Sequence, residues 1–292
     1  MTVLKLLMTI ALSLAISGAQ AYEREVSTAR TGSWYLFSHT AMTTRIELEF
    51  WAYEQARAEQ IAQEVFAGFD YVDQTMSRYR ADSELSLVNA QAASAPLRVS
   101  DELFAVLAAA QEVSRLSAGA FDISFASVGY MYDYRRREQP SESALNESVN
   151  RIDYRKIILD ENAQTVAISN PKMLLDLGGV AKGYSVDLAI KTLQNAGVRN
   201  ARVSAGGDMR LLGDKRGKPW IVGIRDPRVD GSNAVVLPLE SVSISTSGDY
   251  ERFVKFAGKR YAHIIDPRTG YPTTGIKSVT LICPDAELAD AL

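Results

Sequence analysis

The sequence is poor in the two residue types that most often build disulfides and zinc sites. Its 292 residues include one cysteine, Cys283, and two histidines, His39 and His263. A single cysteine excludes a disulfide within the chain, so stability must come from a packed core. The same scarcity disfavours a zinc site. Carboxylates and backbone carbonyls remain as the available metal ligands, and these suit magnesium.

The chain also lacks a strong net charge and a long apolar run. Its net charge is −3 and it has no basic block, so nucleic acid is not an expected partner. The apolar run at residues 6–16 is shorter than the roughly 20 residues that a membrane-spanning helix needs. It follows Lys5 and precedes Ala19-Gln20-Ala21, an arrangement typical of a signal peptide, and no cysteine follows it for a lipid anchor. We therefore expect a signal peptide at residues 1–21 and a soluble, exported, periplasmic chain that begins at Tyr22.

Hydrophobic spacing predicts helices early in the chain and strands later. Apolar steps of three and four over residues 52–76 predict one long helix. Asp82 or Ser83 caps a short helix through Val88, and Ser100 caps a helix over 101–117 that Gly119 ends. Residues 131–150 are polar and predict an exposed loop or excursion. Strands are predicted at 45–51, 156–159, 165–168, 201–204, 209–212, 220–224, 234–237, 241–245, 252–256, 260–265 and 278–283, with a last helix starting at 286. This order favours an α+β fold.

One segment, LLDLGGVAKGYSVDLAI at residues 174–190, combines several features of a ligand site. The apolar run 173–175, the pair Gly178-Gly179 and the helical pattern up to Gly197 predict strand, tight turn and helix. Glycines let a backbone approach a ligand closely, and a helix N-terminus suits an anion. Lys182 can meet a phosphate, and Asp176 can hold a polar group or a metal. A turn that needs glycine only for packing is the alternative, and the P-loop pattern does not fit.

Three more polar turns follow predicted strands, at residues 204–208, 246–250 and 261–272. Each segment alone has the composition of an ordinary turn. Together they place glycines, acids and hydroxyls at several strand ends, as in pockets for phosphorylated ligands. His263, in the last turn, can take a proton from a hydroxyl nucleophile near neutral pH. A structural or solvated histidine is the alternative.

The motifs LDLGGVAKGYSVD, SAGGD, STSGDYERF, HIIDPRTGYP and LADAL, with MSRYRADSELSLVN and SAGAFD upstream, resemble the FAD:protein FMN transferase family, known as ApbE, over residues 34–292. The resemblance implies an α+β domain over residues 22–292, with largely antiparallel sheets, flanking helices and a flavin cleft between the parts. It also implies an enzyme that cleaves FAD, attaches FMN through a phosphoester bond to a threonine of an acceptor protein, and releases AMP. Subunits of membrane redox complexes are candidate acceptors.

The resemblance further implies a set of site residues. His263 would be the general base. The Gly179 carbonyl and the Asp290 carboxylate would bind Mg²⁺. Tyr79 and Phe121 can stack on flat rings, and Lys182 can meet phosphate. The residues implied to contact FAD are Met42, Tyr79, Ala120, Phe121, Asp122, Asp176, Lys182 and Ile264.

The sequence departs from the family pattern in three places. Met42-Thr43-Thr44 stands where the family usually has Met-Gly-Thr, and residues 123–126 lack the usual Gly-Pro. The family motif also continues after Asp290 with further metal ligands, including a hydroxyl residue, whereas this sequence ends at Leu292. We therefore expect weaker magnesium binding than in a form extended by roughly one or two helical turns.

Two other functions use nearly the same residues. A hydrolase would split FAD to FMN and AMP, with water in place of the threonine. An exported binding protein would only store FAD. Loss of His263 or of the metal carboxylate would favour the binding protein, but both are present.

Overall fold

An antiparallel sheet of six strands is the frame of the chain. The computed structural model describes residues 31–133, 136, 138–229, 231–248, 253–256 and 259–292, so the predicted signal peptide lies outside the described residues. The strand order is β1-β2-β6-β7-β10-β13, and every neighbouring pair is antiparallel. The strands are β1 Ser33–Ala41, β2 Thr44–Ala52, β6 Ala201–Ala205, β7 Asp208–Leu212, β10 Ser243–Gly248 and β13 Ser278–Cys283. All but β1 match predicted strands.

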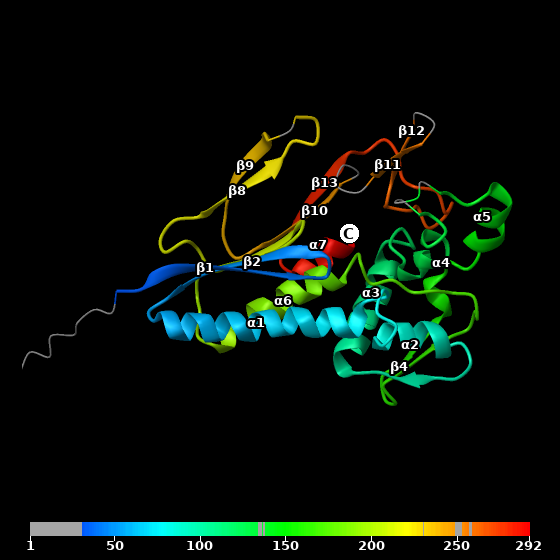
Figure 1. Cartoon of the computed structure of the whole chain (residues 1–292), viewed down its shortest axis with the longest axis horizontal. Helices are drawn as coiled ribbons and strands as arrows, with labels where there is room; N and C mark the ends of the chain where they lie inside the picture. The colour runs from blue at the N-terminus through cyan, green and yellow to red at the C-terminus, as the bar shows by residue number, and fades with distance from the viewer. Residues whose placement is uncertain (1–30, 134–135, 137, 230, 249–252, 257–258) are drawn as a thin grey trace, which may run out of the picture. The chain divides into compact units, whose positions relative to one another are not determined.

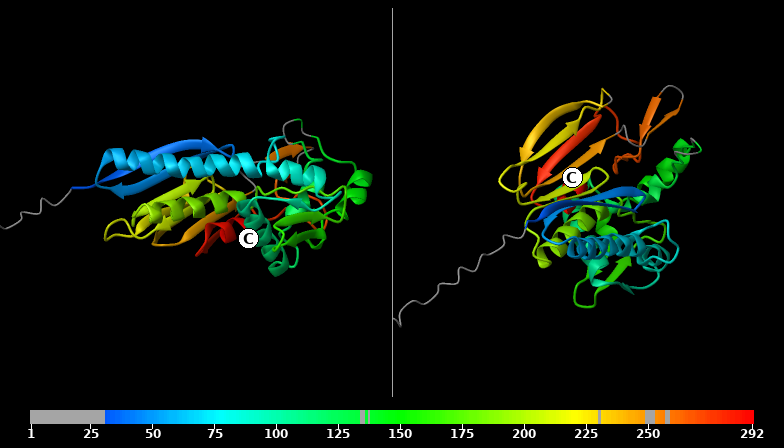
Figure 2. Two further views of the ribbon diagram at one scale, coloured as in Figure 1. Left: turned by 90° about the horizontal axis from the view of Figure 1, so that it is seen from below. Right: turned by 60° about the vertical axis from the view of Figure 1, so that its left-hand side comes forward.

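Two helices cover one face of this sheet, α1 (Gln55–Met76) and α6 (Ala181–Asn195) (Figures 1 and 2). Alternate residues of β2 point at them and are fully buried. Burial of each such large apolar side chain contributes roughly 1.5–3 kcal/mol. The shared core contains Ile46, Leu48 and Phe50 of β2, Ile61, Val65 and Phe69 of α1, and Val186, Ile190 and Leu193 of α6.

A second core lies at the C-terminal end of α1. It packs α2 (Glu84–Gln91) and α3 (Asp101–Leu116) against a sheet of order β3-β5-β4, with bounds Leu97–Arg98, Thr165–Ile168 and Ile157–Asp160. The predicted caps are confirmed: Ser83 Oγ accepts from Ser86 N at 3.0 Å, and Ser100 Oγ accepts from Leu103 N at 3.3 Å. Val72 and Met76 of α1 belong to this second core, so α1 connects the two.

The remaining elements are short. They are the 3₁₀ turns η1 (Ile123–Phe125) and η2 (Tyr154–Lys156), α4 (Ala126–Gly129), α5 (Glu142–Val149), α7 (Ala286–Ala291), and the hairpins β8–β9 (Trp220–Arg225, Asn233–Leu239) and β11–β12 (Phe253–Phe256, Lys259–Ala262). None of the helices in the described ranges is long and apolar enough to cross a membrane. The mixture of helices and antiparallel sheets confirms the predicted α+β class.

Two predicted segments differ in detail from the structure. The segment 131–150, predicted as an exposed loop or excursion, contains the helix α5, with Ser141 Oγ accepting from Ala144 N at 3.2 Å. The only buried apolar side chain of α5 is Leu145. One such residue is not enough to produce a hydrophobic period in the sequence. The predicted strand 260–265 ends earlier, since β12 stops at Ala262. The predicted strand 252–256 is β11 from Phe253 on, and Arg252 lies outside the described residues.

Candidate active site

The extended segment Leu174–Asp176 leads into the candidate site. The predicted strand here was wrong: the segment pairs with side chains and a loop instead of joining a sheet. Leu175 N donates to Asn89 Oδ1 at 2.7 Å, and Asn89 Nδ2 donates to the Leu175 carbonyl at 3.0 Å. Asp176 N donates to the Ile123 carbonyl at 2.9 Å. These bonds satisfy the backbone as a sheet would, and they fix Asp176 just before α6.

The predicted glycine turn and helix are confirmed. Gly178 N donates to Asp176 Oδ1 at 2.7 Å, so the aspartate closes the turn. A Cβ added at Gly179 would lie 3.3 Å from Cε2 of Phe121, which shows that the ring rests against the turn backbone. The helical ladder begins with Tyr184 N donating to Val180 O at 3.0 Å. The Gly179 carbonyl therefore lies one residue before the first carbonyl that accepts a hydrogen bond within the helix.

Lys182, in the first turn of α6, lies between two buried carboxylates. Its Nζ is 2.7 Å from Asp208 Oδ2 and 2.9 Å from Asp290 Oδ1, and the two aspartate side chains are only 3% and 5% exposed. Burial alone would lower the pKa of Lys182, but the charges of Asp290 and Asp208 outweigh it and raise that pKa. Burial raises the pKa of Asp290, and the Lys182 ammonium and the Gly183 N–H oppose that shift. Two carboxylates thus face one ammonium group.

Helix α7 brings Asp290 to this place by packing tightly on α6. Gly183 makes the approach possible, because a Cβ there would lie 2.3 Å from the Ala286 carbonyl oxygen. Gly183 N donates to Asp290 Oδ2 at 3.0 Å. At the other end of α7, Asp187 accepts from Ala286 N at 3.1 Å and from Glu287 N at 2.9 Å. Asp187 therefore serves as an N-cap that α6 supplies to α7.

A second polar cluster adjoins Asp176. The Oδ2 atom of Asp176 is 2.8 Å from Arg78 Nε. The guanidinium carbon of Arg78 lies 3.8 Å from the centroid of the Tyr130 ring and 4.2 Å from that of the Tyr79 ring. Sequence reasoning found Tyr79 and Asp176 but missed Arg78 and Tyr130. Arg78 stands next to Tyr79 in the upstream motif, which was the available signal. Tyr130 lies outside the quoted motifs and gave no such signal.

Met42 lies where the two cores meet. It and Thr43 form the two-residue turn between β1 and β2, with φ of 53° and 58°. This is the left-handed conformation of a tight hairpin, which glycine adopts most easily. Met42 packs against both cores, and Ser185 Oγ of α6 lies 3.5 Å from its sulfur. The hairpin turn is thereby attached to α6 near Lys182.

The segment Ala120–Asp122 has mixed exposure. Ala120 is exposed and Phe121 is partly buried against the second core, whereas Asp122 is buried. Asp122 Oδ1 accepts from Ser124 N at 2.8 Å and from Ser124 Oγ at 2.6 Å, and Oδ2 accepts from Tyr154 N at 2.8 Å. Burial raises the pKa of this carboxyl group, and the hydrogen bonds oppose that shift. Both oxygens of Asp122 thus hold the local fold.

His263 is exposed and directly follows β12. The loop behind it is well anchored: Thr273 N donates to the Ile264 carbonyl at 2.8 Å, and Tyr132 Oη donates to the Gly270 carbonyl at 2.9 Å. Ile265 packs with α4 and α5. The structure therefore gathers Phe121, Asp176, Gly179, Lys182 and Asp290 around the start of α6, while His263 and Ile264 belong to a separate loop whose described backbone is fixed.

The carboxylate oxygens beside Lys182 are of the type that a magnesium ion prefers as ligands. Mg²⁺ prefers oxygen ligands, usually one or two carboxylates with waters and substrate phosphates. Asp208 and Asp290 supply two buried carboxylates with an excess of negative charge over the Lys182 ammonium. Within the described ranges there is no group of three or more His, Cys, Asp or Glu side chains that could hold a metal. Substrate or water oxygens would have to complete the coordination.

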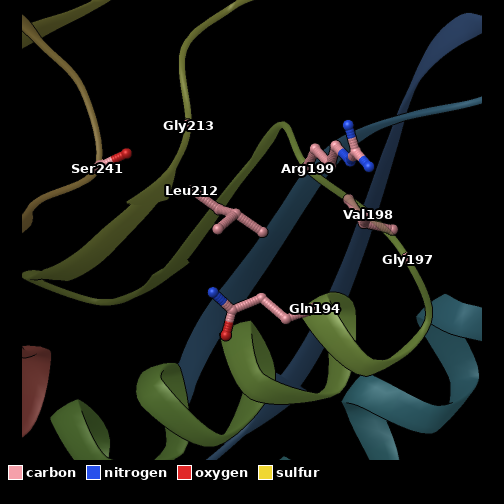
Figure 3. A pocket seen from close by; sticks show the side chains of 7 residues that line it. All are labelled: Gln194, Gly197, Val198, Arg199, Leu212, Gly213 and Ser241. Carbon is pink, nitrogen blue, oxygen red and sulfur yellow. The ribbon is translucent and has the colours of Figure 1, made fainter.

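A depression of about 540 Å³ lies at the other end of α6, around Gln194, Arg199, Leu212 and Ser241 (Figure 3). Helix α6 runs from Ala181 to Asn195, so this depression is about 20 Å from Lys182. None of the candidate site residues described above lines this depression.

Known proteins match this chain over most of its length. The sequence profile of the ApbE family matches residues 42–292. A protein of Haemophilus influenzae named FAD:protein FMN transferase is 34% identical over 81% of this chain and 72% of its own. One of the same name from Treponema pallidum is 36% identical over 79% of this chain and 68% of its own.

Solved structures agree with this relationship. The crystal structure of the ApbE protein from Thermotoga maritima superposes with a TM-score of 0.83 at 31% identity, covering 89% of this chain and 84% of that one. The flavin transferase ApbE from Vibrio cholerae superposes with a TM-score of 0.81 at 30% identity, covering 89% and 85%. The glycine turn, the Lys182 site and these matches together show that the chain belongs to the ApbE family.

Proposed function

We propose that this protein is a FAD:protein FMN transferase that moves FMN from FAD to a threonine hydroxyl of an acceptor protein and releases AMP. The observation that carries the proposal is the start of α6. There a glycine turn, the N-terminus of a helix and a lysine held by two buried carboxylates lie together. The relatives named FAD:protein FMN transferase share this chain's family.

Each group at the site has a part in binding and orienting FAD. Lys182 and the first turn of α6 would face the pyrophosphate once a bound Mg²⁺ offsets the excess negative charge of Asp208 and Asp290, because a cation and a helix N-terminus both favour an anion. Tyr79 and Phe121 offer rings for stacking on the flavin or the adenine. The Gly178-Gly179 turn lets the phosphates approach the backbone closely.

The reaction exchanges one P–O bond for another. The acceptor hydroxyl oxygen attacks the phosphorus on the FMN side, and the bond to the bridging oxygen breaks so that AMP leaves with that oxygen. His263 takes the hydroxyl proton as general base, since histidine is the side chain that most often has this role and its position after β12 is open to an acceptor protein. Asp290 and the Gly179 carbonyl would hold Mg²⁺. When bound, this ion offsets the negative charge that develops on the phosphates.

We also propose that the protein acts after export, in the periplasm. Support comes from the charged start, the apolar run 6–16 and the small-residue signal at 19–21. Acceptors would then be exported domains or the exported portions of membrane redox subunits.

The test is a mass balance. The purified protein is incubated with FAD, Mg²⁺ and a candidate acceptor domain that carries one exposed threonine. We expect the acceptor to gain the mass of FMN, with one AMP released for each modified chain, and Thr→Val in the acceptor to abolish the gain. His263→Ala should lower the transfer rate by about 10²–10⁴-fold with FAD affinity nearly unchanged. Release of FMN and AMP in the presence of an unmodified acceptor would indicate the hydrolase instead, and FAD binding without cleavage would indicate the storage protein.

A further inference from the structure

Arg78 is anchored from two sides just after α1 ends at Met76. Its Nε lies 2.8 Å from Asp176 Oδ2, and its side chain is only 23% exposed. Its guanidinium carbon is 3.8 Å from the centroid of the Tyr130 ring. Tyr130 is fixed in turn, because its hydroxyl donates to the Leu175 carbonyl at 3.2 Å. Burial raises the pKa of Tyr130, so this hydroxyl keeps its proton.

Tyr79 contrasts with its neighbour because its side chain is largely open to solvent. It is 76% exposed, yet the Arg78 guanidinium carbon lies 4.2 Å from its ring centroid and Arg78 Nη2 donates to its hydroxyl at 2.6 Å. An exposed tyrosine without such contacts samples several rotamers, and binding must then order it at an entropic cost. Here a fixed cation already orients the ring.

We propose that Arg78 is a positioning residue that holds Tyr79 as a preformed platform for one of the flat rings of FAD. The inference rests on the proposed function and deepens it. Asp176 and Tyr130 fix the guanidinium, the guanidinium fixes Tyr79, and the exposed area of the Tyr79 ring remains available for stacking. Arg78 acts through Tyr79 rather than on the phosphates, because its Nε already faces Asp176 and its Nη2 already binds the tyrosine hydroxyl.

A double-mutant cycle separates this role from direct binding. FAD affinity is measured by quenching of flavin fluorescence for the unaltered protein, Arg78→Ala, Tyr79→Ala and the double variant. We expect Arg78→Ala to raise the Kd for FAD about 3–10-fold, because binding must then order the Tyr79 ring that Arg78 no longer holds. In the Tyr79→Ala background the same change should raise Kd less than about 2-fold, because the platform is already gone.

Matched variants control for charge and for folding. Arg80 is an exposed neighbour whose ion pair to Asp82 spans 3.5 Å, so Arg80→Ala removes the same charge two residues away and should leave Kd within about 2-fold. Tyr130→Leu removes the ring under Arg78 and should weaken FAD binding, whereas Tyr130→Phe keeps the ring and should weaken it less. Arg78→Lys should restore part of the affinity, and it replaces Arg78→Ala in the cycle if the alanine variant fails to fold.

Two smaller ligands, FMN and AMP, identify which ring of FAD stacks on Tyr79. Titration with FMN alone and with AMP alone shows which half of FAD loses affinity in Arg78→Ala, and we expect only one of them to do so. Equal loss for both halves would overturn the platform role.

Three other results would overturn the proposal. They are an equal effect of Arg78→Ala in both backgrounds, no effect in the unaltered background, or tighter binding, which would mean that Arg78 occupies the place of the ligand ring. If the unaltered protein fails to bind FAD at all, the proposed function fails together with this inference. If it binds FAD and the cycle is additive, only this inference fails.

Discussion

Replacing Gly183 by alanine should detach α7 from α6 and destabilise the chain. A Cβ at this position would lie 2.3 Å from the Ala286 carbonyl oxygen, 2.6 Å from its carbonyl carbon and 2.8 Å from Glu287 Cα. All three atoms belong to the backbone of α7, so no side chain can rotate away. The helix must shift by about 1 Å to reach normal contact, and such overpacking typically costs about 1–3 kcal/mol.

This loss of stability is opposite in sign to the intrinsic preference of a helix for alanine over glycine. Within a helix, alanine is favoured over glycine by about 1 kcal/mol. Gly68 of α1 offers the matched control, since a Cβ there would lie 3.6 Å from Leu188 Cδ2, an ordinary contact. Gly68→Ala should therefore raise the free energy of unfolding by up to about 1 kcal/mol. Because the clash is with backbone atoms, the overpacking cost should fall in the upper part of its range, at about 2–3 kcal/mol. Gly183→Ala should then lower the free energy of unfolding by about 1–2 kcal/mol net of the helix preference, and by more if Asp290 leaves Lys182.

Urea unfolding measures both variants. The transition is followed by far-UV circular dichroism and by the fluorescence of Trp34, Trp51 and Trp220, which pack edge to face. Coincident transitions justify a two-state free energy. If Gly183→Ala is as stable as the parent, or gains as much as Gly68→Ala, then α7 does not pack on α6 as closely as described and the positioning of Asp290 is wrong.

Two substitutions and one sequencing experiment test other parts of the account. Thr43 has a φ of 58°, costly for a β-branched residue, so Thr43→Gly should raise the free energy of unfolding by about 0.5–1 kcal/mol in urea; a loss would show that contacts of Thr43 outweigh the strain. Burial, helped by the charges of Asp187, Asp285 and Asp290, raises the pKa of Glu287 from 4.5 to about 7. The folded state then binds this proton more tightly than the unfolded state, so stability falls as pH rises from 4.5 to 7. Glu287→Gln removes that loss and should stabilise the chain at pH 8 by about 1.5 kcal/mol, half of the full value of the shift because the side chain is partly exposed, with no gain at pH 4. An equal effect at both pH values would exclude this cause. N-terminal sequencing of the exported protein should begin at Tyr22, and a product that retains Met1 would contradict the proposed export.

The fold class and several elements could be predicted because their signals are local. The 3.6-residue period marks α1 and α3, serine caps mark two helix starts, and the double glycine marks the turn before α6. The extended segment at 173–175 could not be predicted, because its partners are side chains such as Asn89, 86 residues away. An apolar run alone does not distinguish a strand from a segment held in this way.

The sequence predicted several residues of the site but not the contacts between them. Lys182 was expected to meet phosphate, and the structure places its Nζ between Asp208 and Asp290, which are distant in sequence. Asp208 was seen only as part of a turn. The Arg78–Tyr130 contact joins the end of α1 to the residue after α4, and no sequence period reports such a contact. Long-range ion pairs and ring contacts depend on the tertiary fold, which motif spacing does not encode.

The central claim is that FMN transfer takes place at the start of α6, and Asp290→Asn tests it most directly. Asparagine keeps the size of the side chain but removes the charge that faces Lys182 and would hold Mg²⁺. Asp285→Asn is the matched control, because Asp285 is 59% exposed at the start of the same helix. The measurement is the rate of FMN attachment to the acceptor with saturating FAD and Mg²⁺. We predict a loss of about 10²-fold or more for Asp290→Asn and little change for Asp285→Asn. An unchanged rate for Asp290→Asn, with the variant folded, would contradict the account.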